Sequence, residues 1–118
     1  MAKNEAASGL RIRLVLGGDA VVGPGKADLL DGIRETGSIS AAGKRMKMSY
    51  KRAWDLVEAL NGMFASPLVT TSKGGIGGGG ARLTPLGGEV LARYRDLQKR
   101  CDAVARDDLL ALRKQLRK

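Results

Sequence analysis

The 118-residue sequence contains no histidine and only one cysteine, Cys101. Without histidine the chain cannot build a His-based zinc site or a Ser-His-Asp triad, and it lacks the most common general base. A single cysteine excludes an intramolecular disulfide and a cysteine-rich metal site. Most familiar routes to an enzyme are therefore closed, and an enzyme by another route remains an alternative. We expect a protein that is not an enzyme and that carries no metal and no cofactor.

Long apolar runs and aromatic residues are also scarce. No segment approaches the roughly 20 apolar residues that a membrane-spanning helix needs, and residues 1–9 lack the apolar run of a signal peptide. We therefore expect a cytoplasmic chain with no membrane partner. Aromatic residues make up 3% of the sequence, which disfavours a stacking platform for single-stranded nucleic acid.

Acidic residues are outnumbered, with 12 Asp+Glu against 21 Lys+Arg and a net charge of +9. Lys and Arg bind polyanions because they displace counterions from phosphates. Between Thr36 and Trp54 there is no acidic residue, whereas five basic residues occur there: Lys44, Arg45, Lys47, Lys51 and Arg52. This favours double-stranded DNA as the partner. Contact with acidic proteins or anionic membranes is the alternative reading of the charge.

The length fits one domain with its own core, since 43% of the residues are hydrophobic. Apolar alternation predicts a strand over residues 11–16, with Ile12, Leu14 and Leu16 on one side. Helical spacing then predicts a helix over residues 26–36 that ends at Gly37.

Two capped helices follow in close succession. Ser38 is the predicted N-cap of a helix over residues 39–46, and Ser49 is the predicted N-cap of a helix over residues 50–64. A tight connection between two such helices is typical of a helix-turn-helix, with an ordinary helical hairpin as the alternative.

The segment after these helices indicates a wing. Residues 67–71 and 81–83 are predicted to be short strands, and the glycine-rich residues 73–80 between them are predicted to be a flexible loop. The strand at residues 11–16 is a candidate third strand of the same sheet. The expected fold is therefore mainly α with a small antiparallel sheet: a winged helix-turn-helix with a long C-terminal helix.

The C-terminal segment begins with Thr84 and Pro85, a typical cap and first helical residue. Apolar residues spaced by four and three form a seam along it, and at Asp107 the phase changes, which predicts a separate short helix beyond that point. The candidate dimerisation residues are Val90, Tyr94, Leu97, Cys101, Val104, Leu109, Leu112 and Leu116. Folding of these leucines back onto the same chain is the alternative. We thus divide the chain into a flexible N-terminus (1–9), a winged helix-turn-helix core (10–84) and a C-terminal helical segment (85–118) that mediates dimerisation.

The candidate DNA-binding residues lie on three predicted elements. Residues in the first turn of the third helix are placed to reach base edges, and Asp55 one turn later either accepts from a cytosine amino group or orients Arg52. Basic residues on the preceding helix are predicted to contact phosphates, and two further basic residues flank the wing. The full set is Lys44, Arg45, Ser49, Tyr50, Lys51, Arg52, Asp55, Lys73 and Arg82. We expect Trp54 to support the third helix rather than to touch DNA.

Residues 37–46 and 48–57 resemble the winged helix-turn-helix of the ModE family of molybdate-responsive transcription regulators. The run Ser-Tyr-Lys-x-Ala-Trp at residues 49–54 is the specific part, whereas residues 37–42 are similar in LysR-type regulators too. The similarity extends from Arg11 to about Asp102 and includes Leu-Thr-Pro-x-Gly at residues 83–87. It implies a homodimeric regulator whose third helix enters the major groove, with target genes for the uptake or use of molybdenum or a related metal.

Members of that family continue into a pair of oxyanion-binding modules, whereas this sequence stops at Lys118. We therefore expect a stand-alone member, with a fragment as the alternative, that does not bind molybdate tightly by itself. A separate oxyanion-sensing protein is then a candidate partner. The alternative function is an interaction or nucleoid-type protein that uses the same fold to bind a partner regulator, or DNA without sequence preference.

Overall fold

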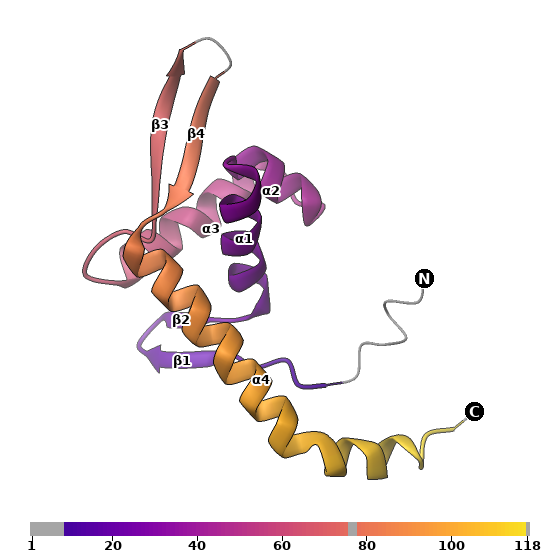
Figure 1. Cartoon of the computed structure of the whole chain (residues 1–118). Coiled ribbons are helices and arrows are strands. Elements are labelled where there is room, and N and C mark those ends of the chain that lie inside the picture. Colours follow the sequence, from indigo (N-terminus) through magenta and orange to yellow (C-terminus); the bar gives the residue numbers. More distant parts are fainter. Residues whose placement is uncertain (1–8, 76–77, 118) are drawn as a thin grey trace.

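The order of elements along the chain is that of a winged helix-turn-helix. The computed structural model describes residues 9–75 and 78–117. Within these ranges it contains β1 (Leu14–Gly17), β2 (Ala20–Val22), α1 (Pro24–Thr36), α2 (Ile39–Arg45), α3 (Tyr50–Met63), β3 (Val69–Gly75), β4 (Gly78–Leu83) and α4 (Pro85–Arg113) (Figure 1). The predicted fold class is confirmed. The predicted flexible N-terminus, except for Gly9, lies outside the described residues.

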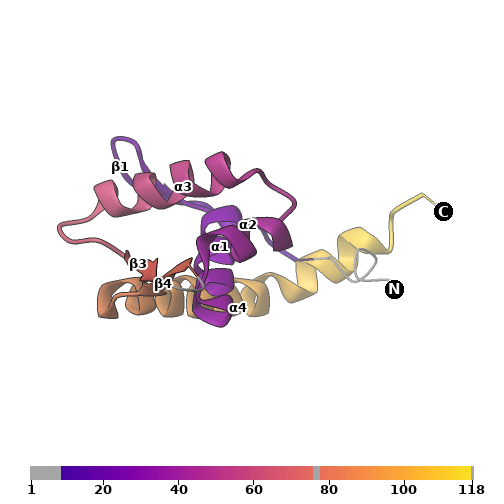
Figure 2. The same ribbon diagram turned by 90° about the horizontal axis from the view of Figure 1, so that it is seen from above.

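The core lies where the helices meet the base of the wing. Figure 2 shows α1 and α2 between α3 and α4. The largest side chains of the core are at most 1% exposed, among them Leu29, Leu30, Ile33, Val57, Leu60, Leu68, Leu91 and Tyr94. The apolar stripe predicted for the first helix is therefore buried, and the first ten residues of α4 complete the same core.

The predicted caps and stops define the helix ends. Gly37 ends α1 in a left-handed conformation with φ of 71°, and its N–H donates to the carbonyl of Ile33 over 2.8 Å. The hydroxyls of Ser38, Ser49 and Thr84 each accept a backbone N–H in the first turn of the following helix, at 3.0, 3.1 and 3.0 Å. Each of these helices therefore begins at the residue after its cap.

Glycines allow the close crossings of the helix-turn-helix. A Cβ atom added to Gly32 of α1 would lie 2.9 Å from Cβ of Ala42 in α2. One added to Gly43 of α2 would lie 2.9 Å from Cβ of Ala53 in α3. Because these separations are shorter than normal carbon contacts, the helices approach as closely as they do only with glycine at both positions.

The N-terminal strand differs from the prediction in extent, partner and facing. β1 begins at Leu14 and pairs with β2, so that Leu14 lies opposite Val22, and it forms a sheet separate from the wing. The predicted third strand of the wing sheet is therefore wrong, because the turn at residues 18–19 returns the chain at once to pair with β1. A register shift between Val15 and Gly17 breaks the alternation, and Leu16 is 55% exposed instead of facing inward.

The wing hairpin is longer than predicted. β3 continues to Gly75 and β4 starts at Gly78, with Gly75 paired to Gly78 and Ser72 to Gly80. Most of the predicted loop is therefore paired strand, since a ladder of backbone hydrogen bonds needs no side chains. Residues 76 and 77, between β3 and β4 in the sequence, lie outside the described residues.

The C-terminal segment is one continuous helix. α4 runs from Pro85 to Arg113 without a break, so the predicted separate helix after Asp107 is wrong. The sequence there contains neither proline nor glycine, and a change in apolar phase only moves the apolar face around the helix. The far part of α4 extends beyond the rest of the molecule (Figures 1 and 2). Among the described residues, no helix has the length and apolarity to cross a membrane.

Candidate DNA interface

The first turn of α3 presents polar side chains away from the core. Tyr50, Lys51 and Arg52 are exposed, whereas Ala53 and Val57 on the other side of the helix are buried. The Ser49 cap starts the helix at this point and leaves the three side chains at its open end. The prediction that they point away from the core agrees with the structure.

Asp55 pairs with Lys51 and not with Arg52. Nζ of Lys51 lies 3.1 Å from Oδ2 of Asp55, one helical turn away. The alternative that Asp55 orients Arg52 is therefore wrong. Both partners are more than half exposed, so this pair is weak and its separation for a ligand costs little.

Trp54 lies on α3 one helical turn after Tyr50, which belongs to the first turn of the helix (residues 50–52, the recognition turn). Its ring meets that of Tyr50 edge to face, with centroids 6.1 Å apart and an interplanar angle of 71°. The indole also packs against the core. Among the described residues, its Nε1 is a buried donor without a hydrogen-bond partner. Trp54 thus supports Tyr50 from within the domain.

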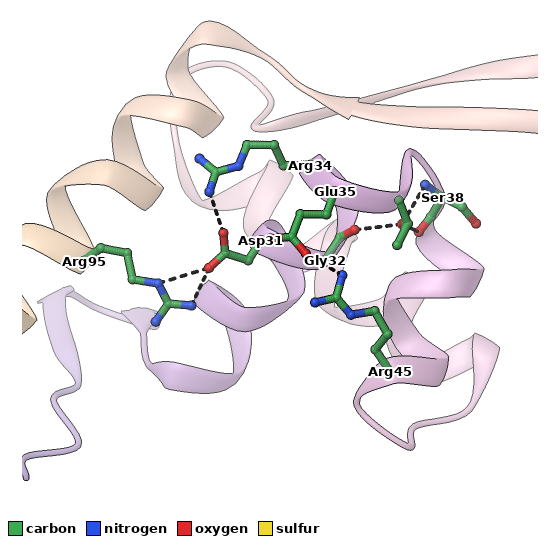
Figure 3. Close-up of polar contacts among 8 residues, drawn as sticks. Asp31, Gly32, Arg34, Glu35, Ser38, Arg45 and Arg95 are labelled. Carbon is green, nitrogen blue, oxygen red and sulfur yellow. Dashed lines mark hydrogen bonds and ion pairs between the residues drawn. The ribbon is translucent and has the colours of Figure 1, made fainter. Parts of the chain in front are cut away.

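Lys44 and Arg45 lie in the last turn of α2, where their positive charge also stabilises the helix end. Nη1 of Arg45 is 2.9 Å from Oε1 of Glu35 on α1, with both side chains about half exposed. Figure 3 shows this pair beside the α1–α2 connection. Among the described residues no ion pair is found for Lys44, Arg52, Lys73 or Arg82, so their charges are available to a ligand.

Sequence reasoning missed the ion-pair cluster that joins α4 to α1. Arg95 donates from Nε and Nη2 to Asp31 over 3.1 and 2.7 Å (Figure 3), and from Nη2 to Asp28 over 2.7 Å. Burial by itself lowers the pKa of Arg95, but the bonds to the two carboxylates more than offset it and raise that pKa above its usual value. The partners are 64 and 67 residues apart, so no local spacing indicates the cluster. It holds α4 against the helix that leads into α2.

The wing and the helix-turn-helix enclose a cleft of about 410 Å³. Lys73 on β3 is exposed and lines it, while Arg82 on β4 is exposed but outside it. Its polar lining also includes residues that sequence reasoning missed: Ser38, Ser40, Thr71 and Ser72. Scattered hydroxyls form no motif, and only the folding of the wing over α2 and α3 brings them together.

The predicted dimerisation residues divide into two groups. Tyr94 is 0% exposed, and its hydroxyl donates to the carbonyl of Ile12 over 2.7 Å. Val90 packs partly buried against the same core. Tyr94 is therefore corrected to an internal contact, because the beginning of α4 covers the core of its own chain, and for Val90, which is only partly buried, a dimer contact stays a prediction.

Apolar side chains are exposed farther along α4. Val104 is 85% exposed, Leu112 65% and Leu116 68%, while Leu97, Cys101 and Leu109 are partly exposed. These six residues, which we call the α4 apolar face, lie beyond the part of the helix that contributes buried residues, and Leu116 lies just after the end of α4. Within the described part of the chain, the fold leaves this face without a covering element.

No family model matches the chain, but its sequence is similar to those of several named proteins. It is 49% identical over 75 residues to the molybdenum-pterin-binding protein MopB of Rhodobacter capsulatus, covering 64% of this chain and 28% of that protein. It is 49% identical over 72 residues to the molybdenum transport protein ModE of Herbaspirillum seropedicae, covering 61% and 27%. With the DNA-binding transcriptional dual regulator ModE of Escherichia coli K12 it shares 40% identity over 93 residues, covering 75% and 36%.

These relatives confirm the resemblance predicted from residues 37–57. The chain spans between about a quarter and just over a third of the length of the curated relatives it matches. The similarity therefore concerns one region of those proteins.

Proposed function

We propose that this chain, a homologue of ModE-type regulators over most of its length, is a sequence-specific DNA-binding transcription regulator. Its targets are genes for the uptake or use of molybdenum or a related metal. Relatives named as a DNA-binding transcriptional regulator and as a molybdenum transport protein support the proposal. The observation that carries it is the exposed first turn of α3, where Lys51 and Arg52 are exposed and Tyr50 shares a cleft with Lys73 of the wing.

The positions of Arg52 and Lys44 fit two different roles, contact with base edges for Arg52 and contact with the DNA backbone for Lys44. Arg52 extends from the open end of α3, the position from which recognition helices contact base edges in the major groove. Lys44 lies at the end of the preceding helix, where a contact to phosphate sets the register without carrying sequence information. Substitutions of these two residues are therefore expected to change DNA binding in different ways.

Gel shifts with a site selected from random duplexes test this division. Arg52→Ala should cost about 1–3 kcal/mol at the selected site and relax the preference at one base pair. Lys44→Ala should weaken binding to all sequences alike and reduce the slope of log K against log salt by about one unit. Lys99→Ala, the same charge change on an exposed position of α4, is the control and should leave both properties unchanged.

Two outcomes decide against the proposal. If excess random DNA competes as well as the selected site, the chain coats DNA without preference, which is the alternative function. If Arg52→Ala and Lys44→Ala reduce binding to specific and random DNA equally, the assignment of base reading to α3 is wrong.

The α4 apolar face is proposed to bind a second copy of the chain. A single winged helix covers one half-site, whereas a twofold partner presents a second recognition helix about 34–36 Å away along the duplex. Large apolar side chains on a protruding helix favour such self-association, since burying each one stabilises by roughly 1.5–3 kcal/mol. Val104 and Leu112 lie on α4 beyond its last buried residue, Tyr94, and Leu116 follows shortly after the end of that helix; all three are more than 60% exposed.

Sedimentation at tens of micromolar tests the dimer. Leu112→Asp should give folded monomers with weak DNA binding, because it places a charge in the proposed contact but disturbs no core residue. Ala92→Asp, on an exposed position over the packed part of α4, should remain dimeric. A wild-type chain that sediments as a monomer at this concentration contradicts the proposal.

Control by oxyanions is proposed to come from a separate oxyanion-sensing protein. The basic residues of the interface are all exposed, and exposed charges hold small anions only weakly in salt. Calorimetry with molybdate at physiological salt is expected to show no stoichiometric site of micromolar affinity on these 118 residues. A single such site would mean that the chain senses the anion directly.

A further inference from the structure

The cleft between the wing and the helix-turn-helix is not used by the base-reading role of α3. Its walls come from three parts of the chain: the start of α2, the first turns of α3, and facing positions of β3 and β4. Besides the partly buried Ser38, whose hydroxyl caps α2, polar groups are contributed by Ser40, Tyr50, Thr71, Ser72 and Lys73. All five residues are exposed, so a ligand reaches them without opening the fold.

The side chains that line the cleft favour one chemical class of ligand. It combines hydroxyl groups and one ammonium group with no carboxylate, and the apolar part of its wall is formed by Ile39, Trp54 and Ala81. Hydroxyls and lysine are frequent donors to phosphate oxygens in DNA complexes. An apolar surface suits the carbon atoms of deoxyribose. Because the lining carries no negative charge, the cleft fits a phosphodiester and its sugar better than a cation.

Trp54 adds a second observation at the same place. Its indole lines the cleft, and its Nε1 is buried without a partner among the described residues. Because Nε1 has almost no exposed surface, it does not face the cleft. Trp54 therefore contributes the apolar part of its ring to the cleft wall, and its indole lies close enough to respond to an occupant.

We propose that this cleft binds one phosphodiester and the adjoining deoxyribose of one DNA strand, held between α3 and the wing. This inference rests on the proposed function and deepens it, because it assigns Ser40, Thr71 and Ser72 as positioning residues. Tyr50 belongs both to the cleft and to the recognition turn. A backbone held in the cleft therefore fixes the depth and register at which α3 meets the base edges.

The same chemistry would accept a free phosphate ion, but the position favours the polymer. The cleft lies between Tyr50 in the first turn of α3 and Lys73 of the wing, and its volume of about 410 Å³ greatly exceeds that of a single small anion. A nucleotide unit of a longer chain fills more of this space and is held by neighbouring contacts.

A methylphosphonate scan of the selected duplex tests the proposal. Each phosphate in turn is replaced by an uncharged methylphosphonate, and affinity is measured for the wild type, Thr71→Val and Thr70→Val. Valine matches threonine in shape but lacks the hydroxyl. Thr70 is the control because it is exposed on the same strand, next in sequence, and does not line this cleft.

The expected result is coupling at one phosphate per half-site. A hydroxyl that donates to a charged group contributes about 1.5 kcal/mol, so Thr71→Val should weaken binding to unmodified DNA roughly tenfold. On DNA neutralised at the cleft phosphate, the same change should have less than about a twofold further effect, because its partner is already weakened. Ser72→Ala should show coupling at the same phosphate, and Thr70→Val at none.

The fluorescence of Trp54, the one tryptophan in the sequence, gives a second readout. Specific DNA should change its emission in the wild type, and the change should be smaller when the cleft phosphate is neutralised. Inorganic phosphate titrated alone should have little effect at physiological salt. A saturable response to inorganic phosphate that Thr71→Val abolishes would assign the cleft to a free anion and overturn the proposal.

Failure of this inference is distinguishable from failure of the proposed function. Specific DNA binding in which Thr71→Val behaves like Thr70→Val, or in which its effect is the same at every phosphate, refutes the cleft assignment alone. If the wild type binds no duplex specifically, both proposals are wrong. Far-ultraviolet circular dichroism of each variant verifies that the fold is retained.

Discussion

Gly87 and Gly88 are adjacent residues in the first turn of α4, and alanine at each should have opposite effects. A Cβ atom on Gly87 would overlap the carbonyl oxygen of Leu68 and approach its carbonyl carbon to 3.0 Å. A Cβ atom on Gly88 would meet nothing within 4 Å. The two substitutions are chemically identical and differ only in what the new methyl group contacts.

The magnitudes follow from these contacts. In a helix, glycine to alanine stabilises by roughly 0.5–1 kcal/mol when the site is open, and this is the expected effect at Gly88. At Gly87 the obstacle is backbone, which cannot rotate away, and overpacking of this kind typically costs about 1–3 kcal/mol. The oxygen of Leu68 also accepts the N–H of Thr84 over 2.9 Å; loss of this bond costs about 1 kcal/mol and roughly cancels the gain in helix propensity, so the net cost stays at about 1–3 kcal/mol.

Thermal unfolding followed by circular dichroism measures the difference. At about 4 °C per kcal/mol for a chain of this size, Gly88→Ala should raise Tm by roughly 2–4 °C and Gly87→Ala should lower it by roughly 4–12 °C. Because Leu68 immediately precedes β3, Gly87→Ala should also shift the wing and weaken DNA binding. Equal Tm values for the two variants would refute the argument, since they would show that α4 does not press on the base of the wing.

Three further results are expected. The amide of Asn61 accepts from the N–H groups of Leu68 and Val69 at 2.8 and 3.0 Å and donates to the carbonyl of Val69, so Asn61→Ala should lower stability in urea by about 2–3 kcal/mol. Burial raises the pKa of Tyr94 above its ordinary 10.0. The folded state therefore keeps this proton longer than the unfolded state, and the stabilisation is complete below about pH 10 and lost above it; Tyr94→Phe should reduce the fall in Tm on the alkaline side. Ser49→Asp should keep the cap of α3 and its stability yet weaken DNA binding through repulsion of phosphate, whereas Ser49→Ala should lose about 1 kcal/mol of stability.

Local rules account for the parts of the molecule that the sequence predicts well. The caps at Ser38 and Ser49 and the stop at Gly37 depend on atoms within four residues along the chain. The buried face of α3 follows from helical spacing alone. For the same reason the exposed position of Arg52 could be derived, because it is the complement of a buried face on the same helix.

Tertiary structure decided which element covers each face and which distant groups meet. The apolar spacing of Tyr94 indicated that its face is covered, but the same spacing suits a second chain and the protein's own core. Only the folded chain places its hydroxyl on Ile12, 82 residues away. The pairing of the wing strands through glycines and the bonds of Arg95 to two carboxylates also became evident only in the folded chain. A periodic pattern predicts which face of a segment is buried. Which element covers that face depends on how the whole chain packs.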